Sequence, residues 1–343
     1  MSFVLQGQQQ HQPQDDAFEI AWVMRRQEET LHYQCNDYLS YLTDDTDDDD
    51  SSSCSLRILS NKSRTKELPS LYVDETCRNV MAKWCSTVVE RCSFDCETVS
   101  LAMNILDRFL SRPEEGMDIL QCRTKFQLAS MTCLYMAIKI HESEALQPQT
   151  IVQLSRGLFS VSQVEGMERR ILFAIDWKVS PPTAWAFLHY YLDMAESSWL
   201  SQMDSEYRVQ ILQFAKLQIQ CTSLEYYYST KKASSIAHAA LTNALKAIGI
   251  LSPKINKWVV MLGKRLEIDY CEVCTLQKVL NRNVPLCIGT LGISTVPVST
   301  TETTPVRLDS KKWTLMEETT TKGPTTNREL SSPRDVINCI SSS

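Results

Sequence analysis

Glycine is scarce in this sequence, which has 9 glycines in 343 residues, where about 7% is ordinary. The chain contains no glycine-rich phosphate loop of the GxGxxG or GxxxxGK[ST] type. It also lacks the GxSxG and HExxH motifs. The sequence therefore gives no support to the enzyme classes that these motifs identify. A binding function is the more plausible expectation.

The chain also has no excess of positive charge. It contains 35 Lys and Arg and 41 Asp and Glu, which gives a net charge of −6. A protein that binds nucleic acid by neutralising phosphates needs a clustered basic surface, so direct nucleic-acid binding is not expected. No apolar run reaches the roughly 18 residues that a membrane span requires, so no membrane partner is expected. Other proteins are the expected partners.

The 13 cysteines have no secretory context, because residues 1–14 lack a basic segment followed by an apolar one. We therefore expect reduced, packed thiols in an intracellular protein. The CEVC stretch, residues 271–274, has zinc-knuckle spacing, but the sequence offers no second CxxC and no paired histidines. No metal and no cofactor are expected.

The N-terminal region, residues 1–69, has a mixed composition. A glutamine-rich start is followed by a predicted helix within residues 18–42, where Ile20, Val23 and Met24 have helical spacing. An acidic, serine-rich run at residues 44–55 is too charged to pack and is expected to be a solvated linker.

The C-terminal tail, residues 287–343, is rich in Ser, Thr and Pro and has little apolar periodicity. This composition predicts disorder. Thr304 and Ser332 each precede a proline, which makes them candidate sites for proline-directed phosphorylation.

Residues 70–178 read as a first set of five helices. The segment Arg78–Arg91 has one apolar face, and a second such segment is stopped by Pro113. The third, Thr124–His141, is apolar nearly all round and should be the buried central helix. A short helix at Pro148 and one that starts from Ser160, which has capping-box spacing to Gln163, complete the set.

A second set of helical patterns follows the SPPT stretch and fills residues 179–286. Five helices are predicted there, at about 183–195, 205–224, 231–248, 253–264 and 269–282. No part of the chain reads as a strand-rich domain. The predicted fold class is all-α, with two successive bundles of five helices.

The stretch AMNILDRFLS, residues 102–111, sets two adjacent charges into an apolar helix. Its periodicity points Asp107 partly inward and lets Arg108 turn to solvent. A buried carboxylate needs a partner, and Arg78 is a candidate because a guanidinium grips a carboxylate through two hydrogen bonds. Two independent surface charges are the alternative, and the pattern by itself favours neither.

A longer stretch decides the matter, because RNVMAKWCSTVVERCSFDCETVSLAMNILDRFLS resembles the cyclin box. The match runs closely over about residues 76–192, and the second half resembles the C-terminal cyclin fold more weakly. The resemblance implies two tandem five-helix cyclin folds with an N-terminal helix and disordered termini. It also implies a buried Arg78–Asp107 ion pair between the first two helices.

The same resemblance implies a regulatory subunit that binds and activates a cyclin-dependent Ser/Thr kinase, rather than an enzyme. It implies a role in cell-cycle control at G1/S, G1/D-like rather than mitotic, and a location in nucleus and cytoplasm. The family's two polar anchors on the kinase fall on Lys139 and Glu168. Flanking kinase contacts are expected at Ile140, Leu172 and Phe173.

Cyclins that recruit substrate or inhibitor peptides use a shallow apolar groove on the first helix. The matching positions here are Val80, Met81, Trp84 and Gln127. Cys77 and Thr87 depart from the family pattern, and Thr87 replaces a glutamate that pairs with the arginine of Arg-x-Leu peptides. Recruitment of basic peptides is therefore expected to be weaker or of altered preference.

A cyclin-fold transcription factor or scaffold that acts without a kinase is the competing hypothesis. It would need a zinc ribbon and a basic face, and the sequence supplies neither. A kinase-independent scaffold stays open because Ile140 and His141 replace an aromatic and an acidic residue of the family pattern.

Overall fold

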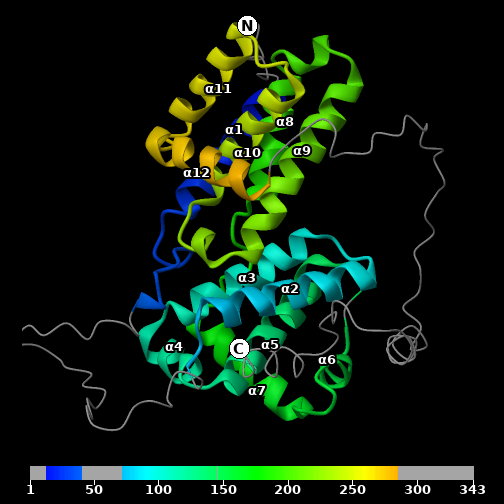
Figure 1. The fold of residues 1–343 in the computed structure, drawn as a ribbon, viewed down its shortest axis with the longest axis vertical. Coiled ribbons are helices and arrows are strands. Elements are labelled where there is room, and N and C mark those ends of the chain that lie inside the picture. The colour runs from blue at the N-terminus through cyan, green and yellow to red at the C-terminus, as the bar shows by residue number, and fades with distance from the viewer. Residues whose placement is uncertain (1–12, 41–71, 145, 285–343) are drawn as a thin grey trace, which may run out of the picture.

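The computed structural model describes residues 13–40, 72–144 and 146–284, and within these ranges every regular element is a helix (Figure 1). The all-α prediction is confirmed for this part of the chain. No helix in the described ranges is long and apolar enough to cross a membrane. The predicted acidic linker, the C-terminal tail and the candidate phosphorylation sites Thr304 and Ser332 lie outside the described residues.

The first bundle lies at the lower end of the molecule in Figure 1 and surrounds one hydrophobic core. Its central helix is α5, whose side chains are buried from Phe126 to Ile138, as its all-round apolar character predicted. The bundle consists of α2 (Glu75–Cys92), α3 (Glu97–Leu110), α4 (Pro113–Leu120), α5 (Arg123–His141), α6 (Pro148–Leu154) and α7 (Val161–Ala174).

The short helix α4 was not predicted, so the described part of this bundle has six helices and not five. Pro113, read as a stop signal, also starts a new helix, because proline at the first helical position loses no hydrogen bond. Helix α7 begins at the predicted capping box, in which Ser160 and Gln163 exchange side-chain and backbone hydrogen bonds.

The second bundle lies at the upper end in Figure 1 and has a hydrophobic core of its own. Its five helices match the five predicted ranges to within two residues at each end, and helix ends are rarely defined more sharply. They are α8 (Ala184–Glu196), α9 (Ser205–Leu224), α10 (Ala233–Ile248), α11 (Pro253–Arg265) and α12 (Tyr270–Asn283).

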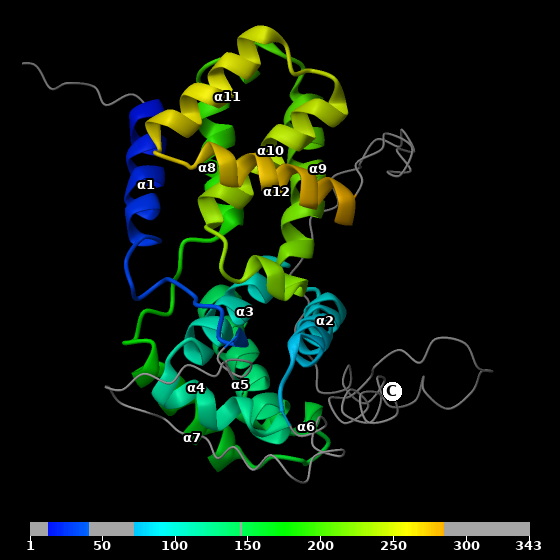
Figure 2. The ribbon, with the colours of Figure 1, turned by 60° about the vertical axis from the view of Figure 1, so that its left-hand side comes forward.

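The N-terminal helix α1 (Pro13–Gln27) packs along α8 at the side of the second bundle (Figure 2). It begins before the start of the predicted range of 18–42 and ends well before the end of that range. It stops where its last turn meets buried polar partners, since Glu28 is 6% exposed and accepts hydrogen bonds from the Ser234 amide and hydroxyl. Residues 28–40 then form turns that lead to the first bundle.

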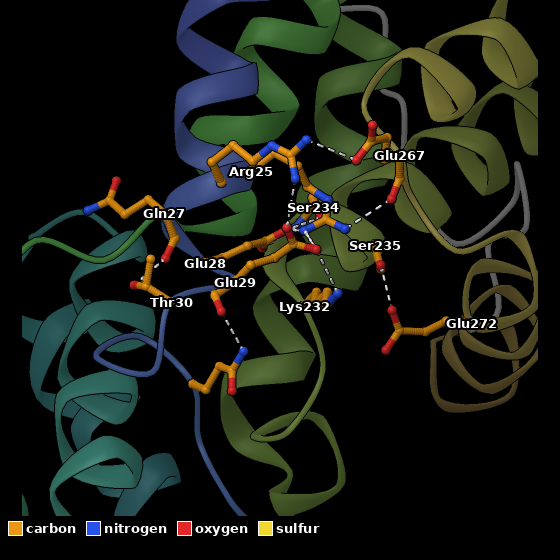
Figure 3. A network of polar contacts seen from close by, with 12 residues as sticks. Arg25, Gln27, Glu28, Glu29, Thr30, Lys232, Ser234, Ser235, Glu267 and Glu272 are labelled. Carbon is orange, nitrogen blue, oxygen red and sulfur yellow. Dashed lines mark hydrogen bonds and ion pairs between the residues drawn. The ribbon is translucent and has the colours of Figure 1, made fainter.

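A network of charges fixes the end of α1 on the second bundle (Figure 3). Arg25 is 3% exposed, and its Nη1 lies 2.8 Å from Glu29 Oε1 while its Nη2 donates to the Glu267 carbonyl at 2.9 Å. Lys232 Nζ lies 3.3 Å from the same Glu29 oxygen. Burial raises the pKa of Glu28, although Ser234 and Arg25 oppose the shift. The ionised Glu28 carboxylate therefore depends on these donors.

Replacing Glu28 by alanine is expected to release α1 from the second bundle. The change leaves the Ser234 amide and hydroxyl without their acceptor, and each unpaired buried polar group costs about 1–3 kcal/mol. Hydrogen exchange of the α1 amides measures the release, and Glu19→Ala, on the exposed side of the same helix, is the matched control. Equal α1 protection in both variants would show that apolar contacts hold the helix without this network.

Candidate functional site

Arg78 and Asp107 meet between α2 and α3, where their side chains are 2% and 3% exposed. Arg78 Nη2 donates to Asp107 Oδ2 at 2.8 Å, and Arg78 Nε lies 3.3 Å from Asp107 Oδ1. This is the two-pronged geometry that a guanidinium and a carboxylate favour. Burial by itself lowers the pKa of Arg78, but the attraction of Asp107 outweighs it and raises the pKa above its ordinary value.

Two further groups complete this buried pair. The Tyr38 hydroxyl donates to Asp107 Oδ1 at 2.8 Å, and Arg78 Nη1 donates to the Ser223 carbonyl at 2.8 Å. Tyr38 is fully buried, and burial followed by the Asp107 charge raises the pKa of its phenol far above the usual range. Sequence reasoning missed Tyr38, because an isolated tyrosine in NDYL carries no periodic signal. The pair thus ties α2, α3, the N-terminal segment and the end of α9 together.

Arg108 does not face solvent, so the prediction for this residue was wrong. Its side chain is 1% exposed, its Nε donates to the His32 carbonyl at 2.8 Å, and its guanidinium lies 4.7 Å from the centre of the Tyr33 ring. Burial lowers the pKa of Arg108. The outer face of α3 would indeed be solvent-exposed in an isolated bundle, but residues 32–33 cover it.

Lys139 and Glu168 lie together at one end of the first bundle. Lys139, near the end of α5, donates from Nζ to Glu168 Oε1 on α7 at 2.7 Å. Their side chains stay 38% and 18% exposed, so both reach the surface. Burial would lower the pKa of Lys139, but the hydrogen bond and charge of Glu168 raise it overall. The ammonium also lies 4.8 Å from the centre of the Tyr135 ring.

Exposed apolar side chains flank this polar pair. Ile140 is 40% exposed and Phe173 is 64% exposed, whereas Leu172 is only partly exposed and packs against the core of the bundle. The surface also includes Trp177, which is 59% exposed and meets Phe173 edge to ring with centroids 5.9 Å apart. We call Lys139, Ile140, Glu168, Phe173 and Trp177 the α5–α7 surface.

Trp177 was not selected from the sequence, because it follows the end of α7 and lies outside its periodic pattern. The chain turns there through two left-handed residues, Asp176 with φ 53° and Trp177 with φ 58°. Such values are unfavourable for residues other than glycine. The turn is closed by the Trp177 amide, which donates to the Leu172 carbonyl at 2.9 Å and so fixes the indole beside Phe173. A DW pair after an apolar helix would have been the only available signal.

The four predicted groove residues are not an open surface in this structure. Met81, Trp84 and Gln127 are 2%, 3% and 1% exposed, and only Val80 is partly exposed. Met81 and Trp84 belong to the core of the first bundle, because they lie on the face of α2 that meets α3 and α5. Neither end of the Gln127 amide has a hydrogen-bond partner among the described residues.

Metal-type ligands converge at one place in the described ranges, and it does not include the CEVC cysteines. Asp95, Glu97 and His141 have ligand atoms within 4.8 Å of one another on an exposed surface. Exposed carboxylates often gather in this way, and here Asp95 already accepts from the Glu97 amide while Glu97 accepts from the Thr183 hydroxyl. The 10 cysteines in the described ranges form no disulfide bond with one another.

The amino-acid sequence of this chain is similar to those of known proteins. Residues 52–180 match the family model of the cyclin N-terminal domain. The chain is 29% identical to mouse cyclin-G1 over 193 residues, which are 55% of this chain and 61% of that protein. It is 36% identical to human cyclin-G1 over 107 residues, which are 31% of this chain and 34% of that protein.

These alignments span less than two thirds of the length of either relative. Among solved structures, a viral cyclin from herpesvirus saimiri aligns with a TM-score of 0.49 and 16% sequence identity, over 61% of this chain and 86% of the viral one.

Proposed function

The chain belongs to the cyclin family, and from that premise we propose that it is the regulatory subunit of a cyclin-dependent Ser/Thr kinase. The observation that carries the proposal is the α5–α7 surface. A Lys–Glu pair that reaches the surface, with Nζ and Oε1 2.7 Å apart, is flanked by the exposed side chains of Ile140, Phe173 and Trp177. Polar groups surrounded by exposed apolar side chains are typical of a surface that binds another protein.

The proposed mechanism is a population shift in the kinase. A kinase of this class is active only when a lysine in its N-terminal lobe pairs with a glutamate on its αC helix. A partner that binds the αC helix better in that position shifts the equilibrium towards it. Lys139 would meet carbonyl groups of the kinase and Glu168 would accept from its amides, while Ile140, Phe173 and Trp177 would supply apolar contact area.

Binding must then compete with the internal Lys139–Glu168 pair. The side chains of Lys139 and Glu168 are 38% and 18% exposed, so water screens their mutual attraction. Such a pair stabilises the fold by at most about 1 kcal/mol. Either group can therefore turn to a partner at small cost. We propose that the pair holds both side chains in place until the kinase arrives.

We further propose a role in cell-cycle control at G1/S and a location in nucleus and cytoplasm. The support is the similarity to cyclins, among them the zebrafish protein named G1/S-specific cyclin-E1, to which the chain is 27% identical over 180 residues. In this function the chain contributes binding and no catalytic group of its own. Since Met81, Trp84 and Gln127 are buried, recruitment of peptides at α2 is not included in the proposal.

A kinase-independent scaffold is the second candidate. It is favoured by Ile140 and His141, which depart from the family pattern beside Lys139. The two candidates differ in whether a kinase is bound at the α5–α7 surface.

Co-purification from cell extract tests the proposal, with three forms of the chain. Wild type is expected to retrieve a cyclin-dependent kinase, and Lys139→Ala/Glu168→Ala is expected to lose it. The swapped variant Lys139→Glu/Glu168→Lys keeps the internal ion pair but presents reversed charges, so it should fold and still fail to bind. Asp193→Ala/Arg208→Ala, which removes an exposed pair 2.9 Å apart in the second bundle, is the matched control.

Each outcome decides between the candidates. Loss of the kinase in both surface variants but not in the control supports the kinase partnership. Retention in the swapped variant means that Lys139 and Glu168 only join α5 to α7. If wild type retrieves no kinase while its bundles are folded by circular dichroism, the scaffold is the better description.

A further inference from the structure

The second bundle contains a cavity that the proposed function does not use. It lies between α10, α11 and α12 and has a volume of about 200 Å³. In Figure 1 these helices belong to the upper bundle, whereas α5 and α7 lie in the lower one. A ligand in this cavity would therefore leave the α5–α7 surface free.

The inner wall of the cavity is apolar and uncharged. Val259 and Val273 line it together with His238, which is 5% exposed. His238 Nε2 lies 3.0 Å from the Val259 carbonyl, and since a carbonyl can only accept, Nε2 carries the proton. Burial lowers the pKa of this imidazole, which favours its neutral form. Gly263 permits the close approach, because a Cβ there would lie 3.1 Å from Nε2.

The mouth of the cavity is positive. Lys246 and Lys264 line it, and none of the lining residues is an aspartate or glutamate. Helix α11 as a whole, PKINKWVVMLGKR, carries four basic residues and no acidic one. Lys254, Lys257 and Lys264 are exposed, and none of them forms an ion pair with a described residue. These three ammonium groups are therefore free to meet carboxylates of a partner.

Exposed apolar groups surround the same mouth. Val260 is 36% exposed and Tyr270 is 69% exposed, and both line the cavity. Met261, 47% exposed, shares the outer face of α11 with Lys257 and Lys264 at helical spacing. Exposed apolar side chains and basic side chains are therefore mixed on one patch around the cavity. An ordinary solvated helix face would instead carry charges of both signs.

We propose that this α10–α12 cavity is a docking site for an acidic peptide segment of a partner protein that inserts one aromatic side chain. The occupant is argued from charge complementarity, because a positive mouth without acidic residues favours carboxylates on the partner. The aromatic anchor is argued from size and polarity. An apolar cavity of about 150 Å³ holds a benzene molecule, so the roughly 200 Å³ here accommodates a phenyl ring.

Fluorescence anisotropy with the full chain tests this proposal. The probe is a fluorescein-labelled peptide whose central phenylalanine is flanked on each side by two glutamates. Its affinity should fall at least tenfold in Lys246→Glu/Lys264→Glu, and also in Val260→Trp, which fills the mouth from an exposed position. Lys83→Glu/Lys178→Glu makes the same charge change at exposed sites of the first bundle and should bind within twofold of wild type.

Two control peptides separate the contributions of charge and anchor. Replacing the phenylalanine by alanine, or the glutamates by lysines, should each abolish detectable binding. If the alanine peptide binds as well, or if the Lys83 and Lys178 control weakens binding equally, attraction is by overall charge and the site assignment is wrong. No binding of the acidic probe at millimolar concentration also overturns the proposal. The kinase co-purification uses other residues, so either proposal can fail without the other.

Discussion

Replacing Asp107 by asparagine is expected to lower the free energy of unfolding by about 3–5 kcal/mol, because it breaks a buried ion pair from one side. Arg78 would remain 1% exposed with its charge, since a guanidinium does not lose its proton in a protein. The Tyr38 hydroxyl would also lose a charged acceptor that lies 2.8 Å away. Urea denaturation followed by circular dichroism measures the change.

A double variant separates the burial of charge from the loss of contact. Arg78→Met/Asp107→Leu removes both charges and keeps apolar volume, and such replacements are often far less destabilising than removal of one partner. We expect the double variant to be more stable than Asp107→Asn. An unchanged denaturation midpoint in Asp107→Asn, or a double variant that is less stable than the single one, would contradict the assignment of this pair as a buried structural link.

Removing the two exposed aromatics of the α5–α7 surface is expected to weaken kinase binding by at least 2 kcal/mol, about 30-fold in the dissociation constant. Large aromatic side chains dominate interface energies when a partner covers them. Phe173 and Trp177 are 64% and 59% exposed and support each other across 5.9 Å, so Phe173→Ala/Trp177→Ala should not disturb the core. Binding to purified cyclin-dependent kinases by surface plasmon resonance measures the effect.

The control for this prediction is Tyr270→Ala, which removes an aromatic of 69% exposure from the second bundle. It should leave kinase affinity unchanged. Unfolding free energies within about 0.5 kcal/mol of wild type for both variants are expected of surface substitutions. Kinase affinity that is unaffected in Phe173→Ala/Trp177→Ala would remove these aromatics from the proposed interface.

Local patterns were sufficient to place most helices. The 3.6-residue period of apolar side chains and the signals at Ser160 and Pro148 act within a few residues, so the sequence predicted α5, α7 and the second bundle closely. The kinase-binding role of Lys139 and Glu168 came from resemblance and stays a prediction. Their mutual ion pair was not foreseen, because no local pattern relates α5 to α7.

By itself, then, the sequence determined the helical class, the division into two bundles and the residues to test, because these depend on neighbours along the chain. Only the tertiary structure decided which side chains are buried by segments that are distant in the sequence. Tyr38 donates to Asp107, 69 positions away in the sequence. Arg108 donates to the His32 carbonyl, 76 positions away, and is buried there although the sequence predicted it to face solvent. Likewise, Glu28, directly after the end of α1, is buried by its contact with Ser234, 206 positions away. Burial is a property of the assembled chain, and periodicity reports only the faces of single helices.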